Sequence, residues 1–289
     1  MKVYEIVEAT QGILVSGNKD DEINFFSQDS RQMKNGGMYI PLKGERFDGH
    51  DFIESAFQTG ATAIITAKDV SYPDKIVIKV EDTYQALKDM AIYLRSHRPV
   101  KVVGVTGSVG KTSTKEVIAS VLKEKYRTLK TQGNFNNELG LPLTVFRLRD
   151  EDEIAVLEMG ISDFGEMTRL AKIAKPETCV ITNIGTCHLE NLGDRDGVLK
   201  AKTEIFSSMK PDGNIILNGD DDKLGTVKEY HGIRPVFFGL NKKYDVYADE
   251  IQSLGLKGMS CRIHMGEQSF SVLVPMPGIH MVYNALAAA

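Results

Sequence analysis

The stretch Val102-Val-Gly-Val-Thr-Gly-Ser-Val-Gly-Lys-Thr-Ser113 has the pattern of a buried strand, a glycine loop and an amphipathic helix. Two glycines in the loop allow tight turns, and its amides and the helix N-terminus would face an anion. Lys111 is expected to reach the outer phosphates of a nucleotide, and Thr112 to offer its hydroxyl to Mg²⁺. The predicted phosphate-binding residues are Thr106, Gly107, Ser108, Val109, Gly110, Lys111, Thr112 and Ser113.

The spacing of this loop departs from the standard phosphate-loop pattern G-x-x-x-x-G-K-[ST]. That pattern would place a glycine at Val105, and the nearest glycine, Gly104, comes one residue too early. The loop is therefore a T-G-x-x-G-K-T variant. A glycine-rich turn without a ligand is the alternative, and the Lys-Thr pair at the start of a helix argues against it.

Outward from the loop, strands and helices alternate. Strands are predicted at 102–106, 154–158, 178–183, 214–218 and 236–238, and helices at 112–125, 164–174, 197–209 and 221–230. Such alternation is typical of an α/β fold with a mostly parallel sheet covered by helices on both faces. Closely spaced β-like runs at 245–251, 259–264 and 269–274 predict antiparallel hairpins at the margin of this sheet.

A smaller α/β domain is predicted before the loop. An amphipathic stretch at 50–59 and a strand at 61–66 are followed by a strand at 75–80 and a helix at 83–97. The helical pattern has to stop before Pro99, because the residue preceding a proline is driven out of the helical region. We therefore expect one domain over residues 1–98 and a second over residues 99–289.

Composition and charge narrow the class of protein. With 42% hydrophobic and 26% charged residues, the chain resembles an ordinary globular protein. Its net charge of −4 provides no global positive field for nucleic acid, so an anionic ligand has to be held by local groups. Three cysteines, no apolar N-terminal segment and no long apolar run predict a cytoplasmic protein without membrane insertion.

Polar residues with possible chemistry follow the predicted strands. Glu158 ends an apolar strand, where a carboxylate can hold Mg²⁺ directly or through water, and His188 follows the next strand as a possible second ligand. A solvated carboxylate, a surface histidine and a zinc site with Cys187 are the alternatives. Lys200 and Lys202 lie on a predicted helix, where composition alone would place both in solvent.

In their order along the chain, these motifs resemble the Mur ligases, the ATP-dependent enzymes that form amide bonds of the peptidoglycan stem peptide. The resemblance is carried by Gly133-Asn-Phe-Asn-Asn-Glu-Leu-Gly-Leu-Pro-Leu-Thr144, Glu158-Met-Gly160, Thr182-Asn-Ile, Cys187-His-Leu-Glu190 and Ala201-Lys-Thr-Glu-Ile-Phe206. Three N-terminal segments resemble the family's UDP-sugar-binding domain: Asp29-Ser-Arg31, Pro41-Leu-Lys-Gly44 and Phe47-Asp-Gly-His-Asp-Phe52. A C-terminal segment resembles the family's adenine-side motif: Pro277-Gly-Ile-His-Met-Val-Tyr-Asn-Ala-Leu286.

The resemblance implies an ATP-dependent ligase that joins D-Ala-D-Ala to UDP-N-acetylmuramoyl-tripeptide through an acyl phosphate. It implies that Lys111 binds the ATP phosphates, that Thr112 and Glu158 hold one Mg²⁺, and that His188 contributes to a second. Lys202 matches the lysine that the family carbamylates with CO₂ to make a further Mg²⁺ ligand. The implied nucleotide contacts are His280 and Asn284, and the implied substrate contacts are Ser30, Arg31, Gly44, Asp48, Gly49, His50, Asn136 and Asn137.

Two features depart from the family pattern. Met281 stands where the family often has an asparagine, and the chain ends at Ala289 within a predicted helix, before the family's C-terminal domain. We therefore expect a truncated, monomeric polypeptide that binds its ligands but does not ligate. A nucleotide-binding module without catalysis is the main alternative. A sister ligase for another amino acid and a folylpolyglutamate synthase are further alternatives, against which the 134–140 stretch and the UDP-sugar-like segment argue.

Overall fold

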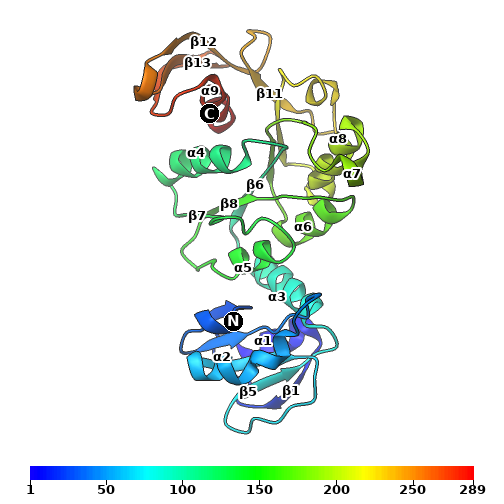
Figure 1. The fold of residues 1–289 in the computed structure, drawn as a ribbon. Coiled ribbons are helices and arrows are strands. Elements are labelled where there is room, and N and C mark those ends of the chain that lie inside the picture. The colour runs from blue at the N-terminus through cyan, green and yellow to red at the C-terminus, as the bar shows by residue number, and fades with distance from the viewer. The chain divides into compact units, whose positions relative to one another are not determined.

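The computed structural model describes all residues, Met1–Ala289, and the chain divides into two compact units. Unit 1 comprises Met1–Arg98 together with Pro142–Leu148, and unit 2 comprises Pro99–Leu141 and Arg149–Ala289. A short segment that comes after Pro99 in the chain, Pro142–Leu148, therefore belongs to the first unit. Each unit is built around a sheet of its own (Figure 1).

Unit 1 contains a five-stranded sheet in the order β1-β5-β4-β3-β2, in which only the β1–β5 pair is antiparallel. Its buried face includes Tyr39, Ile64 and Val77, which pack against α2. The amphipathic stretch predicted at 50–59 divides into a 3₁₀ turn and a helix. The elements are α1 (Val3–Thr10), β1 (Ile13–Ser16), β2 (Phe25–Ser27), η1 (Ser30–Gln32), β3 (Gly37–Tyr39), η2 (Gly49–Phe52), α2 (Ile53–Thr59), β4 (Ala61–Thr66), β5 (Ile76–Lys79) and α3 (Thr83–His97).

Unit 2 contains a nine-stranded sheet in the order β14-β13-β12-β11-β10-β9-β6-β8-β7. The seven strands β6 to β12 pair in parallel, and β13 and β14 add an antiparallel margin. The predicted α/β fold class is therefore confirmed. The strands are β6 (Lys101–Thr106), β7 (Thr128–Lys130), β8 (Ile154–Glu158), β9 (Thr178–Ile181), β10 (Asn214–Asn218), β11 (Val236–Gly239), β12 (Val246–Ser253), β13 (Met259–Met265) and β14 (Gln268–Val274).

Helices cover both faces of this sheet. Figure 1 shows α4 and α9 on one side of the strands and α6, α7 and α8 on the other. The α4 side is closed by Val105, Ile118 and Val180, with side chains of α9 packed beside them. The elements are α4 (Lys111–Lys123), α6 (Glu166–Ala174), α7 (Leu189–Leu192), α8 (Arg195–Thr203), η3 (Glu204–Ser208), η4 (Leu224–Thr226), η5 (Gly255–Lys257) and α9 (Ile279–Ala288). Helix α5 (Gly140–Val145) lies mostly in the segment Pro142–Leu148, which belongs to unit 1.

One predicted helix is wrong. Residues 221–230 form only the 3₁₀ turn η4, whose start the Asp221 carboxylate caps by accepting hydrogen bonds from Lys223 N at 3.0 Å and Leu224 N at 2.9 Å. Gly225 within this turn is a poor helix former, and the backbone becomes extended at Val227, with a ψ of 112°, so no helix follows the cap. The short strand β7 was not predicted from the sequence. None of the helices combines the length and the apolar character that crossing a membrane requires.

The strand order of unit 2 indicates where a ligand would bind, namely at the carboxyl ends of the strands of its sheet. The chain leaves β6, forms β7 and β8 on one side of it, and then returns to form β9 on the other side. In parallel sheets, ligands bind at the carboxyl ends of the strands where the order reverses in this way. The phosphate loop, Glu158 and Asn183 all follow strands at this edge.

Candidate active site

The phosphate loop between β6 and α4 has a backbone that requires glycine. Gly107 has a φ of 148°, and a Cβ at this residue would lie 1.9 Å from Thr182 Oγ1. Gly110, with a φ of 81°, immediately precedes α4. The N–H groups of the first turn of a helix have no partner within the helix, so those of α4 are available to a phosphate group.

Asn183, just after β9, holds the phosphate loop from the neighbouring strand. Its Oδ1 accepts a hydrogen bond from Val109 N at 3.0 Å, and its Nδ2 donates to Val109 O at 3.0 Å. Its carbonyl accepts from Ser108 N at 3.0 Å, and Ser108 Oγ accepts from Gly185 N at 2.7 Å. These bonds preform the loop. Sequence reasoning missed this role of Asn183, because it depends on the pairing of β9 with β6.

Lys111 is folded back onto the phosphate loop. Its Nζ donates to Gly107 O at 2.8 Å and to Ser108 O at 3.3 Å. A phosphate group carries a full negative charge and can replace these two neutral carbonyls as the acceptor. Thr112, the next residue of α4, is exposed, so its hydroxyl is available to a ligand.

Glu158 is buried at the carboxyl end of β8, with 2% of its side chain exposed. Its Oε1 accepts a hydrogen bond from Asn136 Nδ2 at 2.8 Å, and its backbone N donates to Thr131 Oγ1 at 3.0 Å. Its Oε2 is buried and has no hydrogen-bond donor. Such a carboxylate oxygen is costly to bury without a partner, and a divalent cation would supply one. Glu158 therefore fits the role of a metal ligand.

Lys115, one helical turn after Lys111, is a residue that sequence reasoning missed. Its side chain is 1% exposed. Its Nζ donates to Thr131 O at 2.8 Å and lies 3.1 Å from Glu116 Oε1 and 3.7 Å from Glu158 Oε2. The four-residue spacing does place it on the same helix face as Lys111. Its carboxylate partner is visible only once β8 is paired between β6 and β7.

His188 and Cys187 lie in the loop between β9 and α7. His188 has a φ of 56° and a half-exposed side chain whose Nδ1 is 4.0 Å from Glu190 Oε1. Cys187 Sγ donates to Ser108 Oγ at 3.2 Å, next to the phosphate loop. No group of three or more His, Cys, Asp and Glu side chains in the chain could hold a metal. A Mg²⁺ ion here would therefore also take ligands from phosphates and water, as this ion usually does.

Lys202 on α8 is buried, with 1% exposure. Burial lowers the pKa of its amine to about 8; the nearby Cys187 opposes this shift and Lys111 adds to it. Lys200, two residues earlier, is exposed, and its Nζ lies 5.6 Å from the centre of the Phe164 ring. Composition alone would place both lysines in solvent, whereas the structure separates a buried amine from a surface cation.

A pocket of about 360 Å³ opens beside the phosphate loop, within the size range of small-molecule sites. His280 and Asn284, the two predicted nucleotide contacts, both line it, and their contact with a nucleotide stays a prediction. However, the Asn284 amide is already used, since Oδ1 accepts from Thr114 Oγ1 at 2.8 Å and Nδ2 donates to Met281 Sδ at 3.3 Å. The lining residues are Val109, Gly110, Ser113, Thr114, Thr182, Asn183, Asn218, Phe238, His280, Tyr283 and Asn284. The sequence did not point to Asn218, Phe238 or Tyr283.

In unit 1, the first group of predicted substrate residues surrounds η1. Ser30 is buried, and the Arg31 side chain is 84% exposed, with its Nε 2.9 Å from Asp29 Oδ1. This guanidinium is accessible to a ligand in spite of its carboxylate neighbour. Asn137, in unit 2, uses its Oδ1 to accept from Leu139 N at 3.2 Å and Gly140 N at 2.9 Å.

The second group in unit 1 surrounds η2. Asp48 accepts from His50 Nδ1 at 2.6 Å and lies 2.9 Å from Lys68 Nζ, and these two neighbours, Lys68 first, hold its pKa well below the usual range. His50 Nε2 accepts from Ala67 N at 3.1 Å, so the proton of the neutral ring is on Nδ1. A Cβ at Gly49 would lie 2.6 Å from Leu42 N, whereas one at Gly44 would meet only Phe47 O, at 3.6 Å. These contacts shape the loop.

Two family models match the chain. One, described as "Mur ligase middle domain", matches residues 105–289, and the other, described as "Mur ligase family, catalytic domain", matches residues 22–95. The chain belongs to the Mur ligase family. Residues 105–289 include the phosphate loop from Thr106 onward, Glu158 and the pocket beside them.

Relatives with a stated activity cover nearly all of this Mur ligase chain. The UDP-N-acetylmuramoyl-tripeptide–D-alanyl-D-alanine ligase of Bacillus subtilis (strain 168) is 40% identical over 289 residues, which is 99% of this chain and 62% of the relative. A crystal structure of MurF from Acinetobacter baumannii has a TM-score of 0.90 at 36% identity, covering 99% of this chain and 63% of that one. MurF ligase from Thermotoga maritima in complex with ADP has a TM-score of 0.81 at 32% identity, covering 94% and 63%. The chain thus spans less than two thirds of their length.

Proposed function

We propose that this chain is the nucleotide-binding and UDP-sugar-binding part of an ATP-dependent ligase of peptidoglycan synthesis, which joins D-Ala-D-Ala to UDP-N-acetylmuramoyl-tripeptide. The observation that carries the proposal is a preformed phosphate loop with Lys111, in a unit whose buried Glu158 has an Oε2 without a hydrogen-bond donor. The stated activity of the Bacillus subtilis relative supports the choice of substrates. Because the chain spans only 62% of that relative, the activity is proposed for the whole protein.

The proposed reaction has two steps. The terminal carboxylate of the tripeptide attacks the γ-phosphorus of ATP, which forms an acyl phosphate and releases ADP. The amine of D-Ala-D-Ala then attacks the acyl carbon, loses a proton and expels phosphate as the amide forms. Lys111 would leave the Gly107 carbonyl and hold the outer phosphates, and the N-terminus of α4 would bind them through its amides.

Four residues would hold Mg²⁺, which supplies charge neutralisation on the phosphoryl group. Glu158 would contribute its Oε2, which has no hydrogen-bond donor, and Thr112 its exposed hydroxyl to one Mg²⁺. His188 would contribute to a second Mg²⁺, and a carbamate on Lys202 would add a further Mg²⁺ ligand. The carbamate is supported by the pKa of about 8, because the uncharged amine is the form that reacts with CO₂.

The carbamate can be tested without measuring activity. In ¹³C-labelled bicarbonate, the protein should show a carbamate carbon signal that Lys202→Met removes and Lys200→Met leaves in place. Lys200 is the matched control because it lies on the same helix but is exposed. A signal that survives in Lys202→Met, or no signal in the wild type, would rule out the carbamate on Lys202.

In unit 1, we propose that Ser30, Arg31 and the Gly44 to His50 loop bind the UDP-linked substrate. The exposed Arg31 guanidinium is suited to a phosphate group through its remaining donors, since Nε and Nη2 each donate to the Asp29 carboxylate at 2.9 Å. Asp48 and His50 would act by holding the loop in shape, since both are engaged with each other. In unit 2, we propose that Asn136 and Asn137 contact the substrate.

The decisive experiment is a mass-spectrometric assay of the whole protein with UDP-N-acetylmuramoyl-tripeptide, ATP and D-Ala-D-Ala. Formation of the pentapeptide product with release of ADP is expected. Residues 1–289 alone should be stabilised by Mg-ATP and by the UDP-linked substrate but form no product, because holding the amine and excluding water need the rest of the protein. ATP binding by the whole protein without product would favour a nucleotide-binding module instead.

A further inference from the structure

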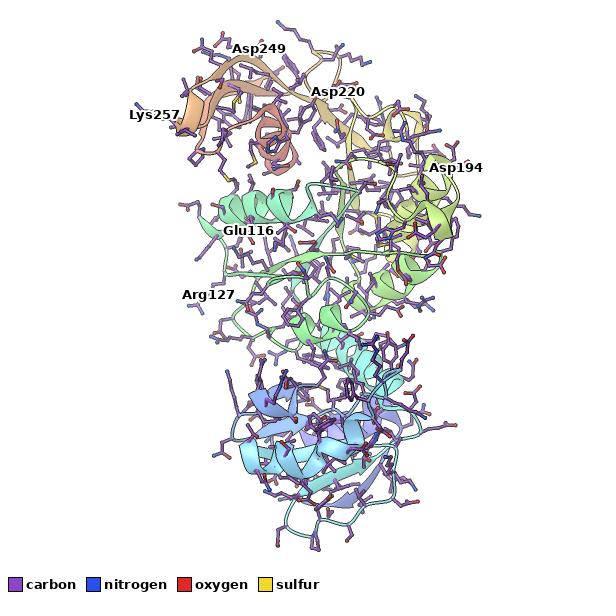
Figure 2. All side chains as sticks on the ribbon, viewed as in Figure 1. Glu116, Arg127, Asp194, Asp220, Asp249 and Lys257 are labelled. Atoms are coloured by element: carbon purple, nitrogen blue, oxygen red, sulfur yellow. The ribbon has the colours of Figure 1, made fainter.

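The phosphate loop has a buried cation on the side of β7 and β8 that the proposed chemistry does not use. Lys115 Nζ is enclosed by Thr131 O at 2.8 Å, Glu116 Oε1 at 3.1 Å and Glu158 Oε2 at 3.7 Å. Glu116 extends from the same helix, α4 (Figure 2), and also pairs with Lys130. Of these partners, Glu158 is the only carboxylate that is buried, with 2% exposure.

We propose that Lys115 is the resident counter-charge of Glu158, which keeps the carboxylate in place and holds down its affinity for a divalent cation until a nucleotide is bound. Lys115 is thus a positioning residue that makes metal binding depend on the nucleotide. The inference rests on the proposed function in one respect, namely that Glu158 is the metal ligand.

Hydrogen bonds hold both side chains, the Glu158 carboxylate and the Lys115 amine, in position. Asn136 Nδ2 holds Oε1 of Glu158 at 2.8 Å, and the Thr131 carbonyl holds the amine of Lys115. Neither group can turn away without breaking a buried hydrogen bond, which costs more than an exposed one. The free Oε2 therefore faces the ammonium group at 3.7 Å, too far for a hydrogen bond but close enough for a strong electrostatic interaction.

This arrangement predicts opposing effects on a metal ion. A dication at Oε2 would gain a carboxylate but would lie near a fixed positive charge in a poorly solvated site, where repulsion is weakly screened. A nucleotide triphosphate brings several negative charges and pairs with Lys111, which offsets that repulsion. Metal and nucleotide should consequently strengthen each other's binding, as linkage requires.

A purely structural role for Lys115 predicts the opposite sign. If the lysine served only to hold Glu158 in place, its removal would loosen the carboxylate and weaken metal binding. If it is the counter-charge, its removal leaves an uncompensated buried carboxylate, and a metal ion binds more tightly. The affinity for a metal without nucleotide therefore separates the two roles.

The test is a titration of the 289-residue chain with Mn²⁺ alone, followed by the electron paramagnetic resonance signal of the free ion. Lys115→Met should bind Mn²⁺ about tenfold more tightly than the wild type, a change of about 1.4 kcal/mol. Lys115→Arg, which restores a positive charge, should bind as the wild type does. Lys130→Met removes a cation that pairs with Glu116 instead, so it is the matched control and should change the affinity less than about twofold.

Two further variants separate the possible failures. Glu158→Gln should abolish the Mn²⁺ site; if it does not, the proposed metal site is wrong. If Glu158→Gln abolishes the site but Lys115→Met binds Mn²⁺ no more tightly than the wild type, the counter-charge role alone is overturned. If Lys115→Met unfolds at too low a temperature for titration, two thermal measurements replace it. Mn²⁺ should raise the melting temperature of Lys115→Met more than that of the wild type, and the double variant Lys115→Met/Glu158→Gln should be more stable than Lys115→Met. Absence of both effects also overturns the inference.

Discussion

Two buried lysines flank the phosphate loop in opposite electrostatic settings. On the β7–β8 side, Lys115 has a carbonyl and two carboxylates around its amine. On the α8 side, burial lowers the pKa of Lys202 to about 8; Cys187 opposes this shift and the positive charge of Lys111 adds to it. The same side chain therefore has two carboxylate neighbours in one region and a lowered pKa in the other. The difference shows that burial and the charges that surround a lysine together decide what it can do.

The largest expected effect is on stability: replacing Lys115 by methionine should lower the free energy of unfolding, and replacing Lys202 by methionine should raise it. Lys115→Met leaves Glu158 buried and unpaired, so it should lower the free energy of unfolding by about 3–5 kcal/mol. Lys202→Met removes a cation that burial disfavours, so at pH 7 it should raise the free energy of unfolding by about 1–3 kcal/mol. Urea unfolding in CO₂-free buffer without metal measures both.

Two less buried lysines, the exposed Lys200 and the half-buried Lys130, provide the controls for this pair. Lys200→Met and Lys130→Met should each change the free energy of unfolding by less than about 0.5–1 kcal/mol, because solvent-accessible cations and their ion pairs contribute little. A loss of stability in Lys202→Met as large as that in Lys115→Met would break the comparison, since both lysines would then be paired cations.

The next effect concerns Lys111, which lies between the two regions. Lys111→Ala should remove most of the stabilisation by Mg-ATP, which reaches about 2.7 kcal/mol when the ligand is at 100 times its dissociation constant. The fold should persist, since Lys111 bonds only to carbonyls of its own loop. Thermal unfolding with and without Mg-ATP measures this. An undiminished shift in the variant would show that the loop does not bind the phosphates.

The smallest effect is a dependence of stability on pH that belongs to Lys202 alone. Its pKa is about 8 in the folded protein against 10.5 when exposed, so the unfolded chain binds more protons between these values and stability rises with pH. The wild type should gain about 1–2 kcal/mol from pH 7 to pH 9 relative to Lys202→Met. Urea unfolding of both proteins in CO₂-free buffer measures the difference. Parallel pH profiles would mean that the amine is not titrating there.

The hydrophobic pattern of the sequence correctly predicted the helices and strands whose ends are marked by turn or capping residues. The strands predicted at 61–66, 154–158 and 214–218 and the helix at 83–97 have the bounds seen in the structure. Each is an apolar or amphipathic run between turn or capping residues, such as Asp82, whose carboxylate accepts a hydrogen bond from Tyr84 N at 2.7 Å. The helix predicted at 221–230 was wrong because the turn that Asp221 caps contains Gly225, a poor helix former, and the backbone becomes extended at Val227.

The site residues divide into those whose neighbours are close in the sequence, which were predicted, and those whose partners come from other strands, which were missed. The phosphate loop was predicted because a strand, two glycines and Lys-Thr are consecutive in the chain. Lys115 and Asn183 were missed as contacts because their partners come from other strands: Thr131 and Glu158 for the lysine, and the loop of β6 for the asparagine. Such contacts depend on strand order, which local pattern does not specify. The roles of the other predicted site residues stay predictions.

The sequence by itself determined the α/β alternation and a loop whose glycines and lysine are suited to phosphate, because these properties depend on backbone conformation and on neighbours within a few residues. Only the tertiary structure decided which lysines are buried and what faces them. Lys115, Lys200 and Lys202 are alike in composition, but one faces Glu158, one faces solvent and one is buried near another cation. Desolvation and distance to other charges set the charge state of a lysine, and both depend on how the strands and helices pack.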